Sequence, residues 1–255
     1  MKNQVPAITK RQLPALNVLL REFHATFAPA TAGPTLTAQH KQLLTDFERE
    51  HATWKKDQVL IAEDFNILHT MQLTRKELCH SDILAWLLDY RLEVFGTHAQ
   101  GKSGFRLFLQ RLGLPLHYTK ADYRVFREAP GEESRLDILI EAERQFVIGI
   151  ENKVDAEEGK DQTRREWADL VRRGKKQSVL PSRVDAFFLT PDALEPESRR
   201  FKAISWRLVA DVFEAFAQEA KPPAVKLFAQ HYAETLRRYV APQTEPEEED
   251  YENTA

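Results

Sequence analysis

The sequence holds a single cysteine, Cys79, among its 255 residues. One thiol excludes an intramolecular disulfide framework and a zinc site built from several cysteines. No segment approaches the roughly 20 consecutive apolar residues that cross a bilayer, and the first residues, Met-Lys-Asn-Gln-Val-Pro, lack the apolar run of a signal peptide. We therefore expect a cytoplasmic protein without a membrane partner.

Several catalytic motifs are missing as well. The chain has no Gly-x-Ser-x-Gly elbow, no glycine-rich phosphate loop with Lys-Ser/Thr, no Gly-x-Gly-x-x-Gly and no His-Glu-x-x-His. These absences argue against the hydrolases, nucleotide-binding proteins and zinc proteases that carry such motifs. The eight histidines are scattered along the chain, and only His80 and His98 stand in contexts that merit attention.

The chain also lacks a net positive charge, since its formal net charge is −3. Six acidic residues and no Lys or Arg fall within residues 243–255, which leaves 36 basic against 33 acidic residues in 1–242. The body of the protein is therefore mildly basic, which permits phosphate binding. We expect the acidic tail at 243–255 to be disordered and solvated.

The most informative pattern that the chain does have is a hairpin at 135–153. Two short apolar runs, 136–140 and 146–150, flank a polar Glu-Arg-Gln, which is typical of two antiparallel strands joined by a short loop. If the hairpin folds about Arg144, Asp137 lies directly opposite Glu151. Cross-strand partners have Cβ atoms roughly 4.5–5.5 Å apart, close enough for two carboxylates to share one cation. Lys153 lies on the same face as Glu151, because side chains alternate along a strand.

Two acids and an ammonium group on one face suit chemistry on a phosphodiester. A hard divalent ion needs oxygen ligands that leave positions for water and phosphate. Asp137, followed by Glu151-Asn-Lys153 on the next strand, resembles the signature of the PD-(D/E)XK nuclease superfamily, whose fold is restriction-endonuclease-like. The resemblance implies that Asp137 and Glu151 bind Mg²⁺ or Mn²⁺ and that the partner is a nucleic acid, with DNA expected.

The Glu-x-Lys triplet alone is a weak signal. It occurs three times, at 151–153, 158–160 and 219–221. Only the first triplet ends an apolar strand and has an aspartate across a hairpin from it. The others lie in a polar segment and at a helix end before prolines, so the context selects the first.

A helix is predicted at 75–90, where Glu77, His80, Ser81 and Leu84 have the spacing of one helix face. Taken alone, this face is a solvated surface or an N-terminal cap. Together with the hairpin, the segment resembles a bacterial subgroup of PD-(D/E)XK proteins in which the leading helix supplies a glutamate to the site. The resemblance implies that role for Glu77.

The helix predicted at 160–171 contains Gln162. Many relatives have a glutamine here, followed by an aromatic residue about one turn later. This chain has Glu166 where the aromatic is expected and Trp167 one position beyond. The resemblance implies that Gln162 positions Lys153 or the phosphate, and the alternative is that Gln162 is simply exposed.

The remaining patterns predict an α/β fold. Strands are expected at 123–128, 184–189 and 203–206, interleaved with helices at 103–112 and 207–220, which suits a mixed sheet covered on both faces. We expect a restriction-endonuclease-like core over 71–242, with a central mixed β-sheet flanked by helices.

An N-terminal helical extension is expected over residues 1–70. It would contain helices at 10–27 and at 43–54, joined by a Pro/Ala/Thr/Gly linker. Three roles stay open for it: packing on the core, which we favour, homodimerisation, and contact with nucleic acid.

The leading functional hypothesis is a Mg²⁺-dependent nuclease whose catalytic residues are Glu77, Asp137, Glu151, Lys153 and Gln162. Two neighbouring carboxylates raise the pKa of a lysine, which favours Lys153 as a cation that orients water over Lys153 as a general base. Glu77 would hold a second metal or a metal-bound water. Glu128 is either an accessory acid or an ordinary strand-end carboxylate.

Two other functions compete with this one. A non-cleaving nucleic-acid-binding or assembly module would keep the nuclease fold without turnover. In a purely structural partner protein, the acids of the hairpin would have no function, although a salt bridge from Lys153 could compensate their charge.

Overall fold

The computed structural model describes residues 38–62 and 64–242 of the chain. The chain divides into two units, Met1–Phe65 and Asn66–Ala255. The helix predicted at 10–27 and the acidic tail lie outside the described residues, whereas the one predicted at 43–54 lies within α2 (Ala38–Ile61). The limits of the core domain, expected at 71–242, remain a prediction. In the described part of the chain, no helix combines the length and the apolar character needed to cross a membrane.

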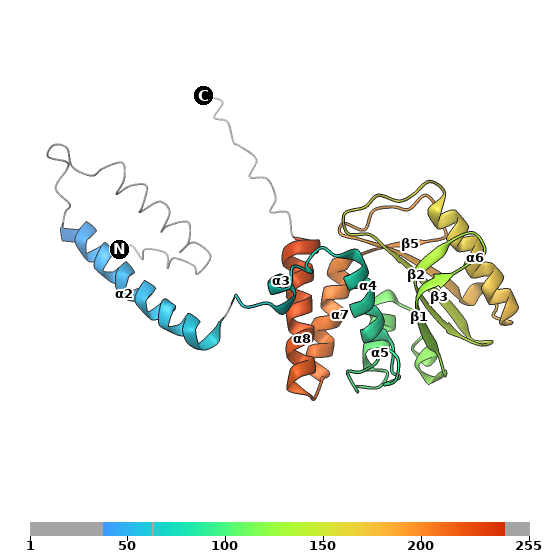
Figure 1. Cartoon of the computed structure of the whole chain (residues 1–255), viewed down its shortest axis with the longest axis horizontal. Helices are drawn as coiled ribbons and strands as arrows, with labels where there is room; N and C mark the ends of the chain where they lie inside the picture. The colour runs from blue at the N-terminus through green and yellow to red at the C-terminus, as the bar shows by residue number, and fades with distance from the viewer. Residues whose placement is uncertain (1–37, 63, 243–255) are drawn as a thin grey trace, which may run out of the picture. The chain divides into compact units, whose positions relative to one another are not determined.

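A five-stranded mixed sheet forms the centre of the second unit, in the order β1-β2-β3-β4-β5 (Figure 1). The first three strands are antiparallel to their neighbours, and β4 and β5 continue the sheet in parallel to β3. The strands are β1 (Arg124–Pro130), β2 (Arg135–Ala142), β3 (Phe146–Asn152), β4 (Val184–Thr190) and β5 (Lys202–Ser205). The mixed sheet is the one the sequence predicts.

Helices cover both faces of this sheet, which confirms the predicted α/β architecture (Figure 1). Helix α6 packs against β3 and β4, α4 packs against β1 and β2, and α7 packs against α5 and α8. The helices of this unit are α3 (Ile67–Thr70), α4 (Glu77–Leu88), α5 (Ser103–Leu112), α6 (Gln162–Lys176), α7 (Trp206–Glu219) and α8 (Pro223–Thr235), with short turns η1 (Leu116–Lys120), η2 (Pro181–Arg183) and η3 (Leu236–Val240).

Most element boundaries lie within a few residues of the predicted ones. Helix α5 ends at Leu112 as predicted, before Gly113, whose φ of 66° is the left-handed conformation that glycine adopts without strain. The strand predicted at 203–206 ends at Ser205 because the Ser205 side chain accepts a hydrogen bond from the Arg207 N–H and caps α7.

The hairpin strands contribute to two cores, one on each face of the sheet. Ile138, Ile140, Ile148 and Ile150 join the core formed with α4, α5 and α7. The side chains that alternate with them, including Leu139 and Val147, join the core under α6. All seven residues of β3 are buried, which explains its unbroken apolar run.

Gly149 lets α6 approach the sheet closely. A Cβ atom at this position would lie 2.7 Å from Leu170 Cδ1 and 2.8 Å from Leu136 Cδ2, closer than real Cβ contacts. Since α6 leads from the end of β3 to the start of the parallel strand β4, its first turn lies at the carboxyl ends of these strands. Ligands of α/β sheets bind at this edge.

Candidate active site

The β2–β3 hairpin brings Asp137 and Glu151 to the same end of the sheet. Its register pairs Ile138 with Ile150 and Ala142 with Phe146, so the turn is centred on Arg144, as the sequence predicts. Arg144 has a φ of 59°, which a short hairpin loop requires at one position. Continuing the register outward by one step places Asp137 opposite Glu151.

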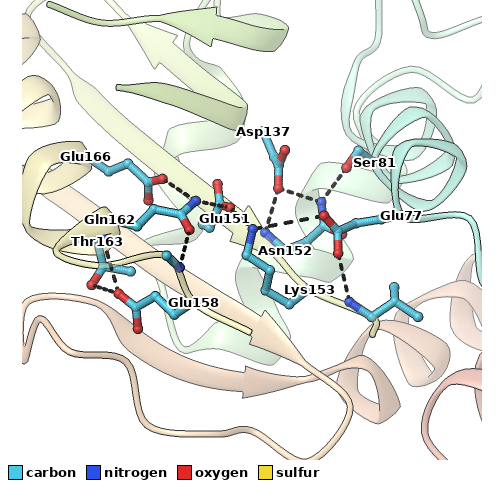
Figure 2. A network of polar contacts seen from close by, with 12 residues as sticks. Glu77, Ser81, Asp137, Glu151, Asn152, Lys153, Glu158, Gln162, Thr163 and Glu166 are labelled. Atoms are coloured by element: carbon cyan, nitrogen blue, oxygen red, sulfur yellow. Dashed lines mark hydrogen bonds and ion pairs between the residues drawn. The ribbon is translucent and has the colours of Figure 1, made fainter. Parts of the chain in front are cut away.

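Glu151 is almost fully buried, with 2% of its surface exposed. Its Oε1 accepts hydrogen bonds from Lys153 Nζ at 2.7 Å and from Gln162 Nε2 at 2.5 Å (Figure 2). Its Oε2 has no hydrogen-bond partner in the described part of the chain. Burial, followed by the charge of Asp137, raises the pKa of Glu151 to about 7, against the opposing effects of Lys153 and Gln162.

Asp137 is held by Asn152, whose carbonyl the sequence offered, with that of Ile150, as a further metal ligand but whose amide groups were given no role. Asp137 Oδ2 accepts from the Asn152 backbone N–H at 2.9 Å and from Asn152 Nδ2 at 2.8 Å. The same amide also donates to Ser81 Oγ, so α4 supports the hairpin through this contact (Figure 2). Burial raises the pKa of Asp137, and the Asn152 N–H and Lys153 act against that rise.

Lys153 lies between two acids from different elements. Its Nζ hydrogen-bonds Glu151 Oε1, and it lies 4.0 Å from Glu77 Oε1. Glu77 is the first residue of α4, and its Oε2 accepts the Val154 N–H at 3.1 Å. Burial acts to lower the pKa of Lys153, but the charge and hydrogen bond of Glu151, with Glu77 and Asp137, outweigh it and raise the pKa.

Gln162 opens α6 and donates from Nε2 to two carboxylates, Glu151 at 2.5 Å and Glu166 at 2.9 Å. Its Oε1 accepts the Gly159 N–H at 3.0 Å, which fixes the orientation of the amide. Glu158 caps this helix by accepting from the Thr163 N–H and hydroxyl (Figure 2). Gln162 therefore contacts Glu151 instead of Lys153.

Glu166 is the acid that the sequence analysis missed. Only 1% of it is exposed, and its Oε2 has no hydrogen-bond partner among the described residues. Burial, followed by the charge of Glu151, raises its pKa to about 9. Its spacing from the buried Thr163 and Leu170 is that of one helix face, so the amphipathic pattern of α6 could have indicated a buried acid.

Comparison with known families adds an independent finding. The family described as the PD-(D/E)XK nuclease superfamily matches residues 65–241, well over half of the chain. The chain belongs to the PD-(D/E)XK nuclease superfamily. No significant match was found among curated proteins or among solved structures. The matched span includes the hairpin, α4 and α6, so every residue of this site lies within the PD-(D/E)XK domain.

The PD-(D/E)XK domain has oxygen ligands that fit a hard divalent cation. Among the residues that the structure describes, no three His, Cys, Asp or Glu side chains form a metal-binding group. Mg²⁺ does not require one, since it is bound by one or two carboxylates and keeps several waters. Glu151 Oε2 is the clearest ligand atom, because it is buried and takes part in no hydrogen bond within the described residues.

The two histidines singled out in this domain have structural contacts. Nε2 of His80 lies 3.1 Å from the Thr74 carbonyl, so it carries the proton, and Nδ1 accepts from the Tyr232 hydroxyl at 3.0 Å. Burial lowers the pKa of His80 to about 4. His98 likewise donates from Nε2 to the Asp89 carbonyl and accepts the Gln100 N–H at Nδ1. Both imidazoles are neutral packing groups.

Glu128 has the contacts of a strand-end carboxylate. It forms an ion pair with Arg135 at 2.8 Å across the β1–β2 pair. Its φ of 51° is unusual inside a strand, and the β1–β2 pairing skips it, although the register is the same at Arg127 and at Ala129. Its charge also contributes to the raised pKa of Asp137.

Proposed function

We propose that the protein is a divalent-metal-dependent nuclease that hydrolyses phosphodiester bonds in DNA. The observation that supports this most is the meeting of Asp137, Glu151 and Lys153 at one end of the β2–β3 hairpin, with Glu151 Oε2 buried and without a donor in the described residues. Asp137 and Glu151 would hold Mg²⁺ or Mn²⁺. Such an ion lowers the pKa of bound water and offsets charge on the phosphate.

Each protein group then has a defined task. Lys153 stays protonated at neutral pH because the acids around it raise its pKa, so it serves as a fixed positive charge beside the scissile phosphate. Glu77 holds Lys153 from the side opposite Glu151 and can accept a hydrogen bond from the attacking water. Gln162 holds Glu151 Oε1, which leaves Oε2 for the cation. Asn152 and Ser81 fix the carboxylate of Asp137.

The test is a panel of single- and double-stranded DNA and RNA incubated with Mg²⁺ or Mn²⁺. The wild type is compared with three variants, Asp137→Ala, Glu151→Gln and Lys153→Ala, and with the charge-matched control Glu157→Gln at an exposed position. We expect wild-type and control proteins to cleave DNA and the three site variants to be inactive while still folded by circular dichroism. Full activity in the presence of EDTA would contradict the proposal.

A second candidate is a nucleic-acid-binding or assembly module that does not cleave. The observation in its favour is Glu166, a buried acid at the position where an aromatic residue is expected in relatives. Salt-sensitive binding of DNA without turnover in either metal would favour this function.

A further inference from the structure

Arg127 is a charged residue on a buried face of β1. It pairs with Ile138 in the β1–β2 register, so both lie on the sheet face that α4 covers, among apolar residues such as Val125 and Ile140. Only 9% of its side chain is exposed. Arginine is seldom buried to this extent unless its charge is paired, so the contacts of this guanidinium indicate its role.

The guanidinium of Arg127 bridges β2 and α4. Its Nε donates a hydrogen bond to the Asp137 carbonyl at 3.2 Å. Its Nη1 donates to the carboxylate of Asp82 and lies 3.5 Å from the Leu78 carbonyl, and both of these residues belong to α4. One side chain of β1 therefore connects the strand that carries a proposed metal ligand to the helix packed over it.

The backbone of Asp137 has an unusual place in the sheet. Of the eight residues of β2, it is the only one without a partner in the registers with β1 and β3, both of which lie in the described part of the chain. The residue opposite it on β1 is Glu128, which the pairing skips and whose φ is 51°. The sheet ladder therefore fixes the residues on either side of Asp137, while the Arg127 side chain holds the Asp137 carbonyl.

Asp137 is thus held at two points by two different strands. Its carboxylate is held from β3 by Asn152, and its main chain is held from β1 by Arg127. A ligand oxygen keeps its position only if both the side chain and the backbone that carries it are fixed. The two α4 residues that Arg127 contacts directly follow Glu77 and Ser81, which are the site residues of that helix. Arg127 therefore couples the position of α4 to that of Asp137.

We propose that Arg127 is a positioning residue of the nuclease site. It fixes the main chain of Asp137 and the first turns of α4, so that the carboxylate of Asp137 meets the cation that it shares with Glu151. Arg127 itself contacts neither the cation nor the DNA. The proposal rests on the nuclease function proposed above and extends the site to β1, a strand that supplies no cation ligand.

A second arginine makes the same kinds of contact away from Asp137 and provides a matched control. Arg173 on α6 donates to the carboxylate of Glu141 at 3.1 Å and to the Pro130 carbonyl at 3.3 Å. It is the more exposed of the two arginines, so the two substitutions are expected to differ in their effect on stability. Affinity for Mn²⁺ is therefore the measurement that separates a positioning role from a purely structural one.

The experiment measures Mn²⁺ binding to the full metal-free chain by calorimetry. We expect Arg127→Met to bind Mn²⁺ about 10- to 30-fold more weakly than the wild type, because Asp137 is less firmly held. Arg127→Lys keeps the buried charge and serves if Arg127→Met does not fold. Its single nitrogen cannot replace a planar guanidinium that contacts Asp137 and Asp82 together, so we expect a loss of about three- to tenfold. Arg173→Met should stay within about threefold of the wild type.

A kinetic measurement distinguishes positioning from direct binding of DNA. At saturating Mn²⁺, Arg127→Lys should cleave DNA with a kcat lowered about tenfold and a KM for DNA within about threefold of the wild type. Wild-type Mn²⁺ affinity in Arg127→Lys, an equal loss in Arg173→Met, or a raised KM with unchanged kcat would overturn the positioning role. These results leave the nuclease proposal standing if the wild type binds Mn²⁺ and cleaves DNA. A wild-type protein that binds no Mn²⁺ and cleaves no DNA would remove both.

Discussion

Two buried polar side chains, one on each face of the sheet, differ in how completely they are hydrogen-bonded. On the α4 face, His80 has both ring nitrogens hydrogen-bonded, to Thr74 and to Tyr232. On the α6 face, Glu166 is equally buried, yet Oε2 has no partner in the described part of the chain. Complete pairing is what a structural polar group requires. Glu166 lacks that complete pairing, and burial favours its neutral form.

The largest expected effect comes from Glu151→Gln. An amide keeps the shape of the side chain but is a poor ligand, so we expect DNA cleavage to fall by about 10³-fold or more and Mn²⁺ binding to be lost. Cleavage rates and calorimetry check this. If the variant keeps more than a tenth of the activity, Glu151 is not a cation ligand.

On the opposite face, His80→Ala should destabilise the fold and leave the site's chemistry intact. The variant opens a cavity beside Trp206 and leaves the Tyr232 hydroxyl unpaired. The free energy of unfolding should therefore fall by about 2–4 kcal/mol. Urea denaturation measures this. Tyr232→Phe, which removes only the hydroxyl, should lower the free energy of unfolding by about 1 kcal/mol. If the folded His80→Ala protein lost Mn²⁺ binding, His80 would not be a purely structural group, which contradicts the contrast drawn between the two faces.

Glu166→Gln should stabilise the metal-free protein at alkaline pH. The folded pKa of about 9 lies above the ordinary value of 4.5, so the folded state holds a proton that the unfolded state has released. Wild-type stability therefore falls as pH rises through this window, and the variant lacks that loss. We expect the melting temperature of the variant to exceed that of the wild type by a few degrees at pH 8.5 and by less at pH 5. In a protein of this size, each kcal/mol of stability shifts the melting temperature by about 2–4 °C. Equal differences at both pH values would contradict a neutral buried Glu166.

The smallest effect is expected for Ser81→Ala. The variant removes the acceptor for Asn152 Nδ2, so stability should fall by about 1 kcal/mol and Mn²⁺ affinity by about tenfold or less, because Asp137 is less firmly held. Thermal melting and Mn²⁺ titration measure the two effects. A loss of stability with unchanged Mn²⁺ affinity would show that Ser81 does not position Asp137.

Local patterns in the sequence were sufficient to predict the hairpin and its register. Its alternating apolar runs and short polar loop fix the register about Arg144, and that register places Asp137 opposite Glu151. The end of α5 before Gly113 follows from helix periodicity and capping in the same way, whereas α4 begins at Glu77, two residues after its predicted start.

Contacts between distant segments could not be predicted in this way. The link from Ser81 to Asn152 joins α4 to β3 across 71 positions. Gln162 was expected near Lys153 or the phosphate, but its contacts with Glu151 and Glu166 depend on how closely α6 approaches the sheet at Gly149. Glu166 was taken as a departure from a familiar pattern, because a charged residue in a sequence gives no direct sign of its burial.

The most direct test of the central claim is a titration of metal-free protein with Mg²⁺ while cleavage of plasmid DNA is followed. We predict no cleavage without metal, a saturable rise on adding Mg²⁺, and no rise in a Glu151→Gln protein that still binds the DNA. Cleavage at the full rate in EDTA, or by Glu151→Gln, would contradict the claim that the β2–β3 hairpin forms a cation-dependent active site.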